Sequence, residues 1–195
     1  MATESFPENV RKMYMADAWE QILRSLGENV DREGLRDTPE RAAKALIELT
    51  NGYTIEIADL FTTFEKDGYD EMVVVRNIDF TSLCEHHVLP FTGHAHVAYI
   101  PDRRIVGLSK IARLVEAFAH RLQVQERLTG QIADALEEHL SPVGVAVVLE
   151  ATHSCMALRG IKKAGSTMVT SALRGALKDK PEARAEALAL LKGAS

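Results

Sequence analysis

The chain has 195 residues, of which 46% are hydrophobic and 26% are charged, and its formal net charge is -5. This length is enough for one substantial core, and the average polarity without a long apolar run excludes a membrane-spanning protein. The acidic balance argues against a general nucleic-acid surface, and the N-terminal sequence lacks the basic-then-apolar pattern of a secretory signal. We therefore expect a cytoplasmic protein that binds neither membranes nor nucleic acid.

The first elements predicted along the chain are two helices. Apolar residues recur at helical spacing in ENVRKMYMADAWEQILRSLG, residues 8–27, which ends at a glycine. In RDTPERAAKALIELTNGY, Thr38 is a candidate cap, Pro39 suits the first helical position and Asn51-Gly52 is a stop signal. We assign residues 1–70 to an N-terminal helical extension.

Residues 71–195 are predicted to form a second domain of strands and helices. Strands are expected at 71–80, 93–101, 144–155 and 166–173, and helices at 109–123, 125–141 and 181–193. Strands followed by helices and then by strands indicate an α+β fold with a mostly antiparallel sheet and helices on one face.

Reactive side chains gather in TSLCEHH, residues 81–87, where Cys84 and His87 have the C-x-x-H spacing of metal ligands. The only other cysteine, Cys155, lies two residues after His153. Three protein ligands leave a fourth position open, which suits a catalytic zinc better than a structural one. His86 and His153 remain for acid–base work, and on a strand His153 would share a face with Cys155. The alternative is that the cysteines are small buried residues and the histidines make ordinary hydrogen bonds.

Several segments together resemble GTP cyclohydrolase I: CEHHVLPFTGHAHVAYIP, GLSKIARLVEAFAHRLQVQERLTGQIADAL, ATHSCMALRGIKK, TSALRG and TPERAAKAL. The resemblance covers about residues 10–180. It implies the tunnelling fold, in which the antiparallel sheets of several subunits join into a barrel, and a homodecamer of two stacked pentamers. It also implies conversion of GTP and water to 7,8-dihydroneopterin triphosphate and formate, the entry step of tetrahydrofolate or related pteridine synthesis.

The resemblance also assigns roles to individual residues. It places one zinc per subunit on Cys84, His87 and Cys155, and the acid–base roles on His86 and His153. A zinc ion there would activate water for attack on C8 of guanine while His153 protonates the ring nitrogen. The substrate-binding positions are Glu126 for guanine, the adjacent Gln125, Ser109 near the ribose, and Lys110, Arg113, Arg159, Arg41 and Lys44 for the triphosphate.

Other interpretations stay open at this point. The chain could be a non-catalytic zinc-stabilised module, or a related tunnelling-fold enzyme in which Cys155, near His153, is a covalent nucleophile. Without the resemblance, Glu126 and the basic residues would be ordinary surface charges. His94 and His96 share one face of a predicted strand and are assigned no role.

The predicted sheet is small for one chain, and its free edges would invite pairing with another subunit. We therefore expect a homo-oligomer in which TSLCEHHV of one subunit meets QVQERLT or GLSKIAR of its neighbours, so that the active site lies at an interface.

Overall fold

The computed structural model describes residues 6–192, which separate after Thr50 into two units. The first unit holds the two predicted helices, α1 (Glu8–Ser25) and α2 (Thr38–Glu48). Thr38 lies inside α2 rather than at its cap, and its hydroxyl donates to the Gly34 carbonyl (3.3 Å). Within the described residues, no helix combines the length and apolarity that a membrane crossing requires.

The second unit, which begins at Asn51, is built on a five-stranded sheet with the order β5-β2-β3-β6-β7. The strands are β2 (Val73–Cys84), β3 (Pro90–Ile100), β5 (Leu122–Gln123), β6 (Gly144–His153) and β7 (Met168–Gly175). All neighbours pair antiparallel except β5 with β2, which confirms the predicted mostly antiparallel sheet. A separate antiparallel ribbon joins β1 (Thr63–Glu65) to β4 (Arg104–Val106).

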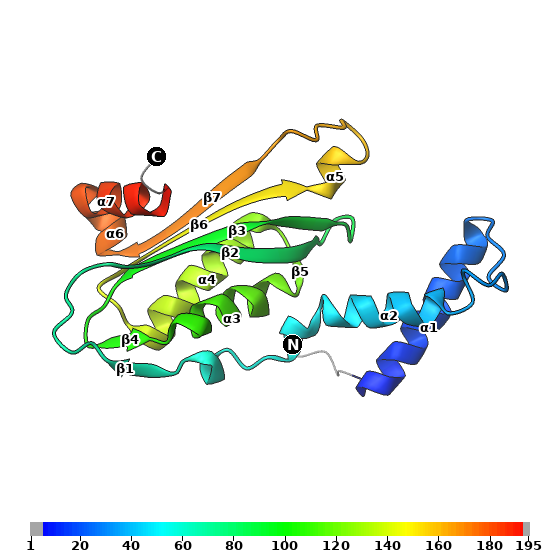
Figure 1. The fold of residues 1–195 in the computed structure, drawn as a ribbon, viewed down its shortest axis with the longest axis horizontal. Helices are drawn as coiled ribbons and strands as arrows, with labels where there is room; N and C mark the ends of the chain where they lie inside the picture. The colour runs from blue at the N-terminus through cyan, green and yellow to red at the C-terminus, as the bar shows by residue number, and fades with distance from the viewer. Residues whose placement is uncertain (1–5, 193–195) are drawn as a thin grey trace. The chain divides into compact units, whose positions relative to one another are not determined.

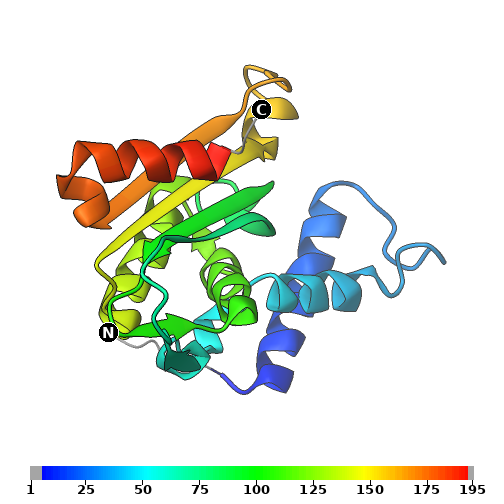
Figure 2. The same ribbon diagram turned by 60° about the vertical axis from the view of Figure 1, so that its left-hand side comes forward.

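Helices cover both faces of this sheet. Successive residues of a strand point to opposite faces of the sheet. On one face, Val97 of β3 and Val147 of β6 pack in a core with α3 (Leu108–Ala119) and α4 (Gln125–Leu140). The next residue along β3, Ala98, belongs to a second buried cluster on the opposite face, which includes Leu191 of α7 (Pro181–Lys192). α7 follows the short α6 (Ala176–Asp179), and Figures 1 and 2 show it on the side of the sheet away from α3 and α4. The C-terminal helix is therefore the exception to the predicted one-sided layering.

Helix α3 runs between opposite ends of the sheet. Its first turn follows β4, where the Gly107 N–H donates to the Thr62 carbonyl (3.0 Å). Its last turn leads into β5, which pairs with Leu83 and Cys84 at the end of β2. Because α3 has 12 residues, its two ends are about 18 Å apart. The first turn of α3 thus lies near one end of the sheet and its last turn near the other (Figure 1).

The 3₁₀ turns η1 (Asn51–Thr54) and η2 (Ala58–Leu60) precede β1, and η1 is fastened to the end of α3. The Gly52 N–H donates to the His120 carbonyl (3.0 Å), and Nε of Arg121 donates to the Gly52 carbonyl (3.1 Å). A Cβ at Gly52 would lie 2.1 Å from the Ala117 carbonyl oxygen, so only glycine fits. Residues 51–70 therefore lie in the second unit.

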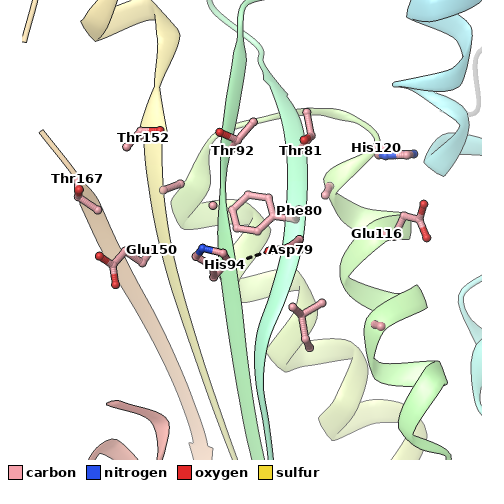
Figure 3. Close-up of a pocket in the computed structure, with 15 residues that line it drawn as sticks. Asp79, Phe80, Thr81, Thr92, His94, Glu116, His120, Glu150, Thr152 and Thr167 are labelled. Atoms are coloured by element: carbon pink, nitrogen blue, oxygen red, sulfur yellow. Dashed lines mark ion pairs between the residues drawn. The ribbon is translucent and has the colours of Figure 1, made fainter. Parts of the chain in front are cut away.

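Among the described residues, β2 pairs with β5 only at Leu83 and Cys84, so most of one β2 edge has no partner strand. A cavity of about 700 Å³ flanks this edge, lined by side chains of β2, β3, β6 and α3 (Figure 3). In it, Nδ1 of His94 lies 2.8 Å from Oδ1 of Asp79. Such a free edge is a template for another strand.

Candidate functional site

The turn after β2 presents the predicted reactive residues. The Cys84 N–H donates to the Leu89 carbonyl (2.9 Å), and the Val88 N–H donates to the Cys84 carbonyl (2.8 Å). Val88 adopts a left-handed conformation with φ of 54°, which reverses the chain toward β3. Cys84 is consequently buried at the strand end, whereas His86 and His87 are exposed on the turn.

Cys155 reaches the same place from β6. The prediction of a strand through Cys155 was wrong, because β6 ends at His153 and Ser154–Ala157 forms a helical turn, α5. His153 and Cys155 are therefore not neighbours on one strand face. The turn instead brings the Cys155 thiol to Cys84 and His87, and one ligand atom from each of the three lies within 4.8 Å of the others.

The donor chemistry of this cluster fits a metal ion. Burial, and then the nearby Cys84, raise the pKa of the Cys155 thiol. Two thiols so close together can both ionise only when a cation offsets their mutual repulsion, and two thiolates with one imidazole are donors that a borderline-soft divalent ion prefers. The raised pKa also argues against Cys155 as an unassisted nucleophile.

His153 is held next to the cluster by two contacts. Its Nε2 lies 2.8 Å from Oε1 of Gln125, the first residue of α4, and its ring stacks on Phe91 at 4.6 Å between centroids with an interplanar angle of 3°. Burial lowers the pKa of His153, and the charge of Glu126 opposes that shift. Gln125 is only 1% exposed and its amide is bonded to groups of this chain, which favours a positioning role over the predicted substrate contact.

The start of α4 is tied to the cysteine–histidine turn within one chain. Arg127 makes two hydrogen bonds to the Glu85 carboxylate (2.5 and 3.0 Å), and these bonds lower the pKa of Glu85. The Glu85 N–H also donates to the Gln123 carbonyl (3.0 Å). QVQERLT was one of the two segments expected to reach TSLCEHHV from a neighbouring subunit. Because it already lies beside that turn in the same chain, a neighbour does not need to supply it. Nothing in the sequence identified Arg127 as the partner of Glu85.

The predicted triphosphate residues are divided between the ends of the sheet. Arg159 follows α5, and its Nη1 lies 3.1 Å from Nε2 of His87, so it belongs to the cluster. Ser109 and Lys110 lie in the first turn of α3, and the exposed Arg113 lies one turn later. That end of α3 is remote from the β2–β3 turn, so one described chain does not bring these residues together.

The remaining predicted basic residues belong to α2 in the first unit. Nη2 of Arg41 pairs with Oδ2 of Asp37 (2.8 Å), and Nζ of Lys44 lies 3.8 Å from Oε1 of Glu48. Both are exposed i,i+4 ion pairs, which contribute little stability and leave the cations available to a stronger anion.

Comparison with known proteins identifies the family. The family model "GTP cyclohydrolase I" matches residues 15–192. "GTP cyclohydrolase 1" of Synechococcus sp. (strain JA-2-3B'a(2-13)) is 55% identical over 91% of this chain and 78% of its own length. "GTP cyclohydrolase 1 2" of Nostoc sp. is 52% identical over 98% and 89%, and "GTP cyclohydrolase 1" of Rattus norvegicus is 50% identical over 91% and 74%. The chain belongs to the GTP cyclohydrolase I family.

Proposed function

We propose that this chain catalyses the GTP cyclohydrolase I reaction, converting GTP and water to 7,8-dihydroneopterin triphosphate and formate at the head of folate or related pteridine synthesis. The observation that carries the proposal is the cluster of Cys84, His87 and Cys155, whose ligand atoms lie within 4.8 Å, with His153 and Glu126 beside it. A family member with these groups in one place has the parts that the reaction needs.

The metal of this proposal is one zinc ion per chain, held by Cys84, His87 and Cys155. Bound there, zinc supplies Lewis acidity that makes water nucleophilic near neutral pH. Nη1 of Arg159 lies 3.1 Å from Nε2 of His87, which places a cation directly beside the proposed metal ligands. The buried end of β2 fixes Cys84, so two ligands are positioned by a strand and a tight turn rather than by a free loop.

Two histidines move protons in this proposal. His153, held by Gln125 and Phe91, accepts a proton from the attacking water and delivers it to the guanine imidazole ring as that ring opens. His86 is exposed on the turn, with its Nδ1 3.8 Å from the Cys84 thiol, and serves the later steps in which formate leaves and the pterin ring closes.

Substrate recognition falls to exposed charges. Glu126, in the first turn of α4, accepts from N1–H and the 2-amino group of guanine, a pair of donors that adenine lacks. Arg159, Lys110 and Arg113 bind the triphosphate and Ser109 lies near the ribose, with Arg41 and Lys44 of α2 as further phosphate contacts. Together they give an acidic protein the local positive field that a polyanion requires.

The assembly of this proposal is a symmetric homo-oligomer, a decamer of two pentamers. Support comes from the split of the site, since Ser109 and Lys110 start a helix whose opposite end leads to the cluster, about 18 Å along its axis. The free β2 edge offers a second copy a place to pair, and that copy would have to supply the α3 residues that the first copy holds away from its cluster.

The test uses purified, metal-analysed protein incubated with GTP, with formate and the fluorescence of the oxidised pterin as readouts. We expect one zinc per chain, release of both products, and loss of metal and activity in Cys84→Ala and Cys155→Ala. His153→Ala should keep zinc and slow turnover by roughly 10²- to 10⁴-fold. Metal binding without turnover would establish the non-catalytic module instead, and full turnover in metal-free protein would refute the zinc mechanism.

A further inference from the structure

A buried hydrogen-bond network lies beneath His153. The Thr129 hydroxyl donates to the backbone carbonyl of Gln125 (2.7 Å), and the Thr129 and Thr170 hydroxyl oxygens are 2.7 Å apart. Nε2 of Gln125 shares its two protons among three acceptors, which are Thr170 Oγ1 (3.1 Å) and the backbone carbonyls of Met168 (3.0 Å) and Leu149 (3.2 Å). Gln125 and Thr129 are each 1% exposed, whereas Thr170 is half-buried, so water has little access to the Gln125 and Thr129 side of the network.

Hydrogen-bond chemistry forces one direction on the whole network. A backbone carbonyl only accepts, so the Thr129 hydroxyl donates its single proton to the carbonyl of Gln125. Thr170 must then donate to Thr129, which leaves its oxygen to accept from the Gln125 amide. The carbonyls of Met168 and Leu149 also only accept, so the amide nitrogen cannot exchange places with its oxygen.

The consequence reaches His153. With its nitrogen fixed toward β6 and β7, the Gln125 amide presents its oxygen to Nε2 of His153 at 2.8 Å. An amide oxygen only accepts, so the proton of the neutral ring must be on Nε2. The stack on Phe91 fixes the plane of the ring, and Nδ1 is left as the nitrogen with a free lone pair.

We propose that Thr129 and Thr170 are positioning residues that, through Gln125, hold the proton of His153 on Nε2 and reserve Nδ1 for proton exchange with the substrate. This inference rests on the proposed catalytic role of His153. It also assigns Gln125 to the support of a catalytic group rather than to GTP. An imidazole in the wrong tautomer offers a donor where an acceptor is needed, which is costly for a general acid–base group.

Kinetics of variants separate this role from substrate binding. Gln125→Leu should lower kcat by about 10²-fold, within the range for a general acid–base group, with KM for GTP changed less than about 3-fold. Thr170→Val keeps the shape but removes the hydroxyl and should lower kcat by roughly 3- to 10-fold, whereas Thr170→Ser should restore it. Thr152→Val, at an exposed threonine that precedes His153, is the matched control and should leave both constants unchanged.

A rise in KM for Gln125→Leu with unchanged kcat would overturn the proposal, because it would make Gln125 a substrate contact. Equal losses in Thr170→Val and Thr170→Ser would also overturn it, since the hydroxyl would then be irrelevant. Neutron diffraction of deuterium-exchanged wild-type crystals at pH 8 gives a readout without turnover. Deuterium on Nε2 of His153 supports the proposal and deuterium on Nδ1 refutes it, whereas failure of the proposed function would appear separately as wild-type protein that releases no formate from GTP.

Discussion

Mixed oligomers test whether two chains share each site. The structure places Cys84 at one end of the sheet and Lys110 in the first turn of α3, which begins at the other. We therefore predict that Cys84→Ala and Lys110→Ala oligomers, each severely impaired alone, regain activity when dissociated, mixed and reassembled. Each new site could then combine an intact turn from one chain with an intact α3 from another.

The expected recovery follows from counting. In a 1:1 mixture, a site needs its turn from a Lys110→Ala chain and its α3 from a Cys84→Ala chain, so about one quarter of the sites in a closed ring are intact. Formate release per chain should thus approach roughly a quarter of the wild-type value, and mass analysis of intact particles would verify that mixing occurred.

The structure also supplies a matched control that should not recover. Glu126 follows Gln125, whose amide bonds His153 of the same chain. One chain therefore supplies both the Cys84 turn and Glu126 to a given site. A mixture of Cys84→Ala with Glu126→Ala should therefore stay inactive. Recovery in this control, or none in verified Cys84→Ala and Lys110→Ala hybrids, would refute the assignment of the site to these chain segments.

Three further outcomes are expected. Glu126→Gln should lower kcat/KM for GTP by about 10- to 100-fold, because an amide donor faces a guanine donor, and steady-state kinetics with unchanged values would place guanine recognition elsewhere. Gly52→Ala should cost about 2–3 kcal/mol through its clash with Ala117, seen as a Tm roughly 5–10 °C lower, whereas Gly130→Ala, whose Cβ meets nothing within 4 Å, should be neutral or stabilising. Burial lowers the pKa of His96, so at His96 the folded chain binds fewer protons than the unfolded chain, and the free energy of unfolding should fall as pH drops below about 6.5. Thermal melts from pH 5 to 8 should show a shallower fall of Tm with pH for His96→Gln than for the wild type. Identical slopes for the two proteins would contradict this.

The helices and strands were largely predictable because their periodicity is strong, and the exceptions have tertiary causes. The run GVAVVLEATHSC is typical of a buried strand to its end, yet the strand stops at His153 and Ser154–Ala157 turns helical. This turn brings Cys155 to Cys84, which is a contact between segments far apart in the sequence. The helix propensity of Ser154–Ala157 alone does not predict it. The position of α7 on the second sheet face is likewise set by the alternation of Ala98 with Val97, which only the strand register reveals.

The metal candidates were predictable from spacing and from the scarcity of cysteine, but their supports were not. The Gln125 network joins a helix start to two strands, with Thr170 lying 45 positions from Gln125 in the sequence. Threonine and glutamine are common in helices and strands, so neither residue type marks a site. The pairing of Glu85 with Arg127 was also not predictable, because the sequence alone does not show which charged residue pairs with another 42 positions away.

The division of the site explains why assembly and activity should be coupled. The groups proposed to open the guanine ring, His153 and the cysteine–histidine cluster, gather at one end of the sheet together with Glu126, whereas Lys110 lies in the first turn of α3 and Arg113 one turn later. A single chain would thus offer the triphosphate mainly Arg159, a weak hold on a polyanion for a protein whose net charge is -5. The same strand edge that would be an aggregation hazard in a monomer becomes, once paired, the means of delivering the missing cations. Ring closure and GTP capture would then both depend on the free edge of β2 and on the different surface that a cyclic ring brings against it.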